Sequence, residues 1–450
     1  MYSLNAMANV EDTRIDMDNS HLNPKTDDKK SVWPLGVYAL GLMVMPDNLV
    51  LSGQFAGQLG IFAPLILAAS VLIYFSYANS FANLYVISSN AAGKDFKGHT
   101  YMGAWLAYYP FVIRILAAVL LTTGLTVSSG FVFNEVFVYW FPNFAFAFIL
   151  LAGLVGLQVL GKTYRHKAQL FFVSAVLLGL AILIVVGLTT SLVQDMAQVN
   201  SDGPISISGL FLPLLLLLGF DMALNLEGNS SSPSPANLKS LKLAIAVFAG
   251  ILIFWVMTAL LQVDGRRLAG TSIAHLIIAR EIGGQVGRLV MGLMIIAGTC
   301  AAVNALFESV AGLTRTLSQQ GMLPPMHFLP KAMVLCMAVV AAFLMANGLA
   351  GEELLEVLIR AVLLLWLGKY GLVTVQLLLQ PTSTSASKNG RSHAQNMFQL
   401  ILISIVTFGA ILVLVLTDDQ PMLIFIIMIL SVLTVFIFGG INWLYMRRTR

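Results

Sequence analysis

Two stretches of the sequence contain no charged residue over more than the width of a membrane. Neither the segment from Ala168 to Gln194 nor that from Gln420 to Met446 contains an Asp, Glu, Lys or Arg. An apolar helix of about 20 residues crosses the hydrocarbon core of a bilayer. Only 10% of the whole chain is charged, whereas about 25% is usual in soluble domains. The sequence therefore predicts an all-α polytopic membrane protein.

The hydrophobic pattern predicts twelve transmembrane helices. They are expected near residues 34–59, 61–88, 103–131, 143–161, 167–192, 206–227, 240–262, 287–314, 332–349, 356–379, 398–417 and 421–446. The connection from Val263 to Val286 is long enough to contain a further short helix outside the membrane.

The connections between these segments alternate in charge. One set is basic and carries, among others, Lys94, Lys97, Lys162, Arg165, Lys167, Lys239 and Lys242. The other set is mostly acidic and carries Glu135, Asp195, Asp202, Glu352, Glu353, Asp418 and Asp419. The exception in this set is the connection from Val263 to Val286, which contains Arg266, Arg267 and Arg280. Basic loops stay on the cytoplasmic side. We therefore expect a multi-pass protein of the plasma or inner membrane with both termini in the cytoplasm.

The distribution of polar residues predicts the division of the chain into parts. Residues 1–31 are polar with mixed charge, which is typical of a disordered cytoplasmic tail. The stretch "QPTSTSASKNGRSHAQN", residues 380–396, is a Ser/Thr-rich cytoplasmic linker. The parts around it are expected to be a ten-helix transport core at 32–379, two additional transmembrane helices at 397–446 and a basic cytoplasmic C-terminus at 447–450. The core would consist of two five-helix repeats, 32–192 and 206–379.

The first and sixth segments, which open these two repeats, share an unusual composition. Their helix breakers are Pro46, Gly53, Pro213 and Gly219. Each also has one acid near its centre, Asp47 in "MVMPDNLVLSG" and Asp221 in "LLGFDMALN". Interrupted helices at corresponding positions in two repeats mark the binding site of many transporters. Glycine and proline also permit close helix packing in membranes, which is the alternative interpretation. The paired acids favour a site for a zwitterion, or for an ion with its substrate.

Five ionisable residues fall inside the predicted membrane spans. They are Asp47, Arg114, Asp221, Glu308 and Lys369. A charge in lipid costs at least a few kcal/mol, so such residues are candidates for function. Each also has an alternative role.

Asp47 would bind a substrate ammonium, take up a coupling proton or cap the helix after Pro46. Glu308 would carry a coupling proton or pair with Arg114 or Lys369. Lys369 would replace a sodium ion as a fixed cation, or form half of an ion pair.

Two stretches of the chain resemble the amino acid–polyamine–organocation superfamily of secondary transporters. "LLLLLGFDMALNLEGNSSSPSPANL" is similar to the family's sixth-span binding segment through Gly219, Phe220, Asp221 and Glu227. "NALFESVAGLTRTLSQQGMLPP" is similar to its eighth span through Thr314, Arg315, Gly321, Leu323 and Pro324. The resemblance implies an inverted five-plus-five repeat (LeuT-like) with broken helices 1 and 6. It also implies that Phe220 is a candidate gate. By their residue types, Trp366 and Tyr370 are either packing residues or gates.

The first span departs from the family pattern of Gly-Ser-Gly-Ile-Phe. This chain has Leu51, Ser52 and Gly53, followed by Gln54 and Phe55. The segment "VLSGQFAGQLG" is similar to that of ethanolamine-type permeases. If the helix breaks there, the resemblance implies that the backbone amides of residues 51–53 bind a substrate carboxylate.

These observations predict a permease that moves an amino acid or a small organic amine by alternating access. Coupling to a proton or to a sodium ion is expected. The alternative is a membrane sensor or partner subunit that keeps the fold without transporting. The two cysteines and six histidines show no metal-ligand spacing, and we predict no cofactor, no bound metal, no nucleic-acid partner and no enzymatic activity.

Overall fold

The computed structural model describes residues 33–90, 101–193, 207–225, 235–319, 322–324, 326–349, 353–379 and 393–449. The predictions made for residues 1–31, for 380–392 of the linker, for Glu227 and for Gly321 lie outside these residues. All regular elements in the described ranges are helices. In chain order they are α1 (Trp33–Met43), α2 (Pro46–Leu59), η2 (Gly60–Phe62), α3 (Ala63–Asn90), α4 (Tyr101–Val136), α5 (Asn143–Val159), α6 (Lys162–Val193), η3 (Ser208–Leu210), α7 (Pro213–Leu216), η4 (Phe220–Asn225), α8 (Pro235–Gln262), α9 (Gly265–Ala269), α10 (Ala274–Gln319), α11 (Leu329–Ala346), α12 (Glu353–Leu378), α13 (His393–Leu416) and α14 (Pro421–Thr449).

Nine helical stretches in the described part are long and apolar enough to cross a membrane. The difference from the twelve predicted spans has three sources. The first span is broken between α1 and α2, the fourth is the 17-residue helix α5, and the sixth is a run of short helices. The chain is therefore a multi-pass, all-helical membrane protein.

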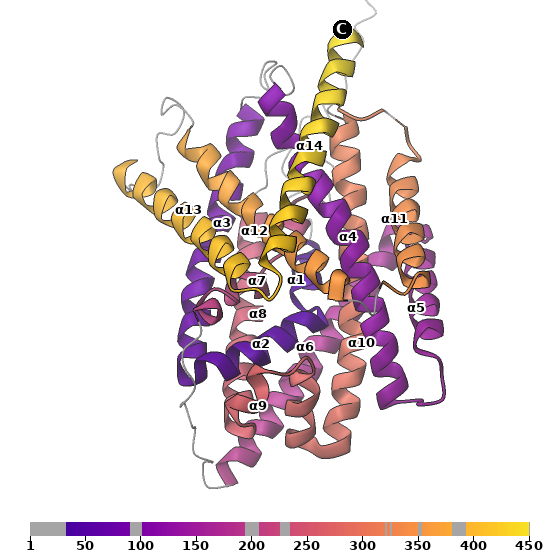
Figure 1. Cartoon of the computed structure of the whole chain (residues 1–450), viewed down its shortest axis with the longest axis vertical. Coiled ribbons are helices and arrows are strands. Elements are labelled where there is room, and N and C mark those ends of the chain that lie inside the picture. Colours follow the sequence, from indigo (N-terminus) through magenta and orange to yellow (C-terminus); the bar gives the residue numbers. More distant parts are fainter. Residues whose placement is uncertain are drawn as a thin grey trace, which may run out of the picture.

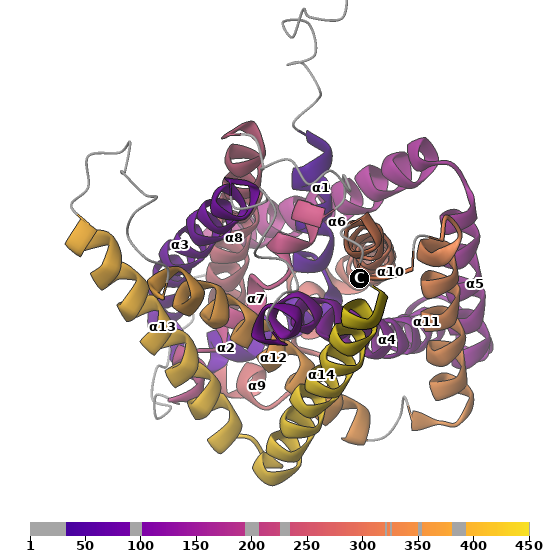
Figure 2. The same ribbon diagram turned by 90° about the horizontal axis from the view of Figure 1, so that it is seen from above.

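Interior and peripheral helices differ sharply in burial. In α4, α10 and α12, 72% of the most apolar stretch is buried, whereas only 17% is buried in α14. Figure 1 shows α13 and α14 slanting across the outside of the bundle, and the view from above places α7 and α12 nearer its middle (Figure 2). The interior helices α4, α10 and α12 are those that carry Arg114, Glu308 and Lys369.

The first interruption lies before Pro46, not at Gly53. Helix α1 ends at Met43, and α2 then runs without a break from Pro46 to Leu59. Proline has no N–H and is suited to the first turn of a helix, so Pro46 begins the second half of the span. The predicted break at Ser52 and Gly53 was wrong.

The sixth span is interrupted as predicted. Pro213 begins the single-turn helix α7, and the backbone then turns through Gly219 at a φ of 97° before η4. This left-handed conformation is readily adopted only by glycine. The irregular backbone places Asp221 in the first turn of η4.

The connection from Val263 to Val286 forms helices, as expected. It contains α9 and the beginning of α10, which kinks at Gly283 and Gly284. Just after the kink, Arg288 pairs with Glu135 at the end of α4 over 2.6 Å. This connection therefore shares one end of the bundle with an acidic connection, at the bottom of Figure 1.

Two predicted boundaries near the C-terminus were inexact. Helix α13 begins at His393, inside the predicted linker. Helix α14 continues through Arg447 and Arg448 to Thr449, so these basic residues extend a helix instead of forming a tail.

Candidate functional site

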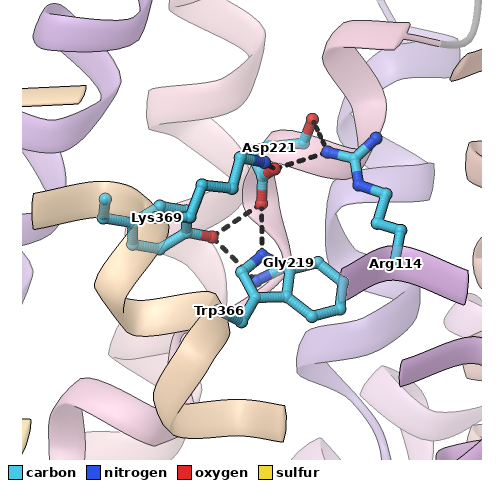
Figure 3. A network of polar contacts seen from close by, with 6 residues as sticks. Arg114, Gly219, Asp221, Trp366 and Lys369 are labelled. Carbon is cyan, nitrogen blue, oxygen red and sulfur yellow. Dashed lines mark hydrogen bonds and ion pairs between the residues drawn. The ribbon is translucent and has the colours of Figure 1, made fainter. Parts of the chain in front are cut away.

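The carboxylate of Asp221 is the centre of a buried cluster of polar side chains (Figure 3). Only 1% of Asp221 is exposed. The Nη2 atom of Arg114, from α4, lies 2.5 Å from Asp221 Oδ2. The ammonium of Lys369, from α12, forms an ion pair with the same oxygen atom. Two cations from two interior helices thus share one carboxylate oxygen.

Two uncharged donors bind the other oxygen of Asp221. The indole Nε1 of Trp366 donates to Oδ1 over 3.0 Å, and the hydroxyl of Tyr370 donates to it over 2.7 Å. The Tyr370 oxygen also accepts the backbone N–H of Gly219, over 3.1 Å. Residues three and four apart lie on one face of a helix, which is why α12 directs Trp366, Lys369 and Tyr370 to the same carboxylate.

Aromatic rings surround this cluster. Phe220 and Tyr370 lie 5.2 Å apart between ring centroids, and both pack against Tyr74 of α3. The Lys369 Nζ atom lies 5.3 Å from the centroid of the Phe81 ring. Aromatic faces attract cations, and here they stabilise a cation that belongs to the protein.

Asn48 connects the two interrupted spans. Its side-chain amide donates to the carbonyl of Met43, the last residue of α1, over 2.7 Å. It also donates to the carbonyl of Leu216, the last residue of α7, over 3.1 Å. Broken helices leave carbonyl groups that need partners inside a membrane. Asn48 is fully buried and supplies a donor to both interruptions.

The predicted site residues fall into two groups. Gly219, Phe220, Asp221 and Lys369 come together in the cluster. Leu51, Ser52 and Gly53 lie in the regular helix α2. The Ser52 hydroxyl donates to the carbonyl of Leu49, and Gly53 allows close approach of Ala274 from α10. The N–H groups of residues 51–53 belong to the hydrogen-bonding pattern of that helix, so binding of a carboxylate by these amides would require α2 to open there.

Asp47 lies in the first turn of α2 and is half-buried. The N-cap residue is Met45, and no side-chain hydrogen bond caps the helix. The predicted capping hydrogen bond is therefore absent from this end of α2. A negative charge in the first turn is still favourable because it faces the positive end of the helix dipole.

Glu308 belongs to a second buried cluster. Its carboxylate pairs with Arg165 of α6, and not with Arg114 or Lys369 as the sequence suggested. One turn before it on α10, Asn304 accepts from Gln158 of α5 and donates to Gln169 of α6, each over 2.7 Å. The ring of Tyr38 from α1 lies 5.5 Å from that of His166.

Sequence reasoning did not find several of these residues. Asn48 stands beside a predicted break, and Gln158 and Gln169 are polar residues in or near apolar spans. Isolated amides inside such spans are the signal that indicates them, because an unpaired amide in lipid is costly. Their partners become apparent only in the folded chain.

Comparison with solved structures gives matches over nearly the full length of the chain, among them structures of a membrane transporter. Two mutants of the manganese transporter of Eremococcus coleocola each match with a TM-score of 0.58 and 12% identity, covering 93% of this chain and 95% of theirs. The same transporter in complex with an aromatic bis-isothiourea compound matches with a TM-score of 0.54 and 13% identity.

No protein-family model and no curated protein sequence matches the chain. At this low identity the likeness establishes the fold alone, and the similar structures named above belong to a transporter and not to an enzyme. The chain thus has the fold of a membrane transporter.

Proposed function

We propose that the chain is a secondary active transporter that moves an amino acid or a small organic amine by alternating access, coupled to protons. The transporter fold over the full length of the chain supports this proposal. Two interrupted spans held together at their broken ends by Asn48 support it further. The segment around Gly219, Phe220 and Asp221 resembles the amino acid–polyamine–organocation superfamily, and the first-span segment "VLSGQFAGQLG" resembles its ethanolamine-type branch.

The observation that carries the proposal is the Asp221 cluster. A buried carboxylate with two cations is often less favourable for stability than apolar side chains of the same volume. Such a cluster therefore indicates a role in function and not in stability alone. The cluster also lies on the irregular backbone between α7 and η4. Binding sites of transporters are formed by such interrupted helices. We therefore assign the substrate site to Gly219, Phe220 and Asp221, together with the α4 and α12 side chains that contact Asp221.

Coupling is assigned to Asp47, Glu308 and Lys369. Asp47 stands at the interruption of the first span, and Lys369 contacts Asp221 directly. Glu308 is 5% exposed and paired with Arg165. Release of that pair would allow Glu308 to exchange a proton as the transporter changes conformation.

The proposed arrangement in the membrane has twelve crossings, with an inverted five-plus-five repeat and both termini in the cytoplasm. The basic connections support this orientation. The ion pair between Glu135 and Arg288 agrees with it, because it joins two connections that the proposed arrangement puts on the same, external side. Helix α5 and the two interrupted spans then complete the crossings that length and composition alone do not identify.

Manganese is the second candidate substrate because similar structures belong to a manganese transporter. Within the described ranges, no group of three or more His, Cys, Asp and Glu side chains could hold a metal ion. The two cations on Asp221 would also repel a divalent cation. We therefore favour an organic solute.

Uptake into liposomes tests this proposal. The purified full-length protein is reconstituted and given labelled amino acids, amines or Mn²⁺ under an imposed pH gradient. We expect an amino acid or an amine to accumulate, and we expect a protonophore to abolish the accumulation. Properly folded protein that accumulates none of these solutes would instead support the sensor or partner-subunit interpretation. Accumulation of Mn²⁺ alone would replace the organic substrate.

A further inference from the structure

The hydrogen-bonding capacity of the Asp221 carboxylate is already used within the protein. An ionised carboxylate offers about four acceptor positions on its two oxygens. Arg114 and Lys369 bind Oδ2, while Trp366 and Tyr370 bind Oδ1. A substrate ammonium would have to displace one of these four donors. Asp221 is therefore a poor receptor for an amine.

The donors of Lys369 are in the opposite situation. Its ammonium has three N–H groups, and the hydrogen bond that the structure gives it is to Asp221 Oδ2. That oxygen is shared with Arg114, and the further contact of Lys369 is with the face of the Phe81 ring. Within the described ranges the acceptor of the Lys369 ammonium is Asp221, and at 6% exposure bulk water does not supply the further acceptors. The ammonium of Lys369 therefore has N–H groups with which it could bind a ligand, and a cation of this kind selects an anionic ligand.

The backbone makes the anion the movable partner. Lys369 projects from the long regular helix α12, whereas Asp221 lies on a short 3-10 turn directly after the glycine turn at Gly219. Fewer backbone hydrogen bonds hold such a segment, so it moves at lower cost than a helix. An incoming anion would therefore displace Asp221 and leave the cation in place.

We infer that Lys369 binds a carboxylate group of the transported solute, for which Asp221 substitutes when the site is empty. This inference rests on the proposed function and narrows its substrate class. A carboxylate is required of the solute, and an ammonium group is not. Amines without a carboxylate are excluded.

The two hypotheses for the site predict opposite effects of the same substitutions. If Asp221 competes with the solute, Asp221→Asn removes the competitor and tightens binding of carboxylates. If Asp221 instead binds a substrate ammonium, the same change abolishes binding. Lys369→Met acts in reverse: it removes the receptor for a carboxylate, and it releases Asp221 for an amine.

The test measures binding to the purified full-length protein with probes that share a carbon skeleton. Glycine, acetate and methylamine form one set, and phenylalanine, hydrocinnamate and phenethylamine form a second. We expect the carboxylates of at least one set to bind and its amine to fail. Asp221→Asn should tighten carboxylate binding, and Lys369→Met should weaken it, each by about tenfold or more, which is 1.4 kcal/mol per tenfold.

Glu281→Gln, which removes an exposed ion pair with Arg267, is the matched control and should leave binding unchanged. Thermal unfolding of each variant verifies that it is folded; if Asp221→Asn does not fold, Lys369→Met alone decides. Amine binding that Asp221→Asn abolishes, or carboxylate binding that survives Lys369→Met, overturns the inference and leaves the transporter proposal standing. Failure of all probes together with failure of all uptake overturns both.

Discussion

The two buried acids with ion pairs inside the bundle have different surroundings. Asp221 lies on irregular backbone and receives four donors, two of them cationic. Glu308 lies within the long helix α10 and pairs with one cation, Arg165, whose side chain is 11% exposed. One negative charge faces two positive charges in the first cluster, and one faces one in the second.

This difference indicates a division of roles. A balanced pair on two regular helices, α6 and α10, can form and separate as those helices move, which is what a gate or a coupling site requires. Asp221, by contrast, lies on irregular backbone and is shared by two cations. Lys369 therefore keeps N–H groups that can donate to another acceptor, which is what an anion-binding site requires. The following substitutions test whether the two clusters differ in this way.

The largest effect on stability is expected from Asp221→Asn. The substitution leaves Arg114 and Lys369 buried without the charge that they share, and removing one partner of a buried pair costs about 3–5 kcal/mol. Thermal unfolding in detergent measures the change. The double variant Asp221→Asn with Lys369→Met should recover part of the loss. A single variant as stable as the unmodified protein would show that the cluster is not an electrostatic unit.

A smaller loss is expected from Asn48→Ala. It deletes the donor to the carbonyls of Met43 and Leu216, and leaving buried acceptors unpaired costs about 1–3 kcal/mol. Because these carbonyls end the two half-helices, solute uptake should also fall. Thermal unfolding and uptake are measured on the same preparation. Unchanged uptake in a destabilised protein would mean that Asn48 has a structural role alone.

The smallest effect on stability is expected from Glu308→Gln. Arg165 keeps hydrogen bonds to the carbonyls of Gln158 and Leu160 and retains some exposure, so we expect a cost of about 1 kcal/mol. Gradient-driven uptake should be lost, while exchange of labelled for unlabelled solute should continue. The exposed ion pair of Arg267 and Glu281 serves as a comparison, because a surface ion pair of this kind contributes less than about 1 kcal/mol to stability. Normal accumulation by Glu308→Gln would remove this residue from the coupling mechanism.

The sequence predicted one interruption correctly and misplaced the other. In the sixth span, Pro213 and Gly219 both lie where the backbone leaves the helix. In the first span, the composition predicts a break at Gly53, but a glycine is tolerated inside a helix where a neighbour approaches closely, as Ala274 does here. Pro46 marked the true boundary because proline begins helices more readily than it continues them.

The partners of the charged residues were less accessible to sequence reasoning. The spacing of Trp366, Lys369 and Tyr370 places them on one face of a helix, but nothing in it names Asp221 as their common acceptor. The sequence offered Arg114 and Lys369 as partners of Glu308, and only the packing of α6 against α10 shows that its partner is Arg165. Long-range ion pairs depend on the arrangement of helices, which hydrophobic periodicity does not determine.

An experimental structure with bound solute is the most direct test of the central claim. A solute that accumulates in liposomes is added to the purified protein, and the complex is solved by cryo-electron microscopy. The account predicts density for a carboxylate within hydrogen-bonding distance of Lys369 Nζ, with Asp221 moved away from that atom. Density elsewhere in the bundle, with the contact between Asp221 and Lys369 intact, would contradict it.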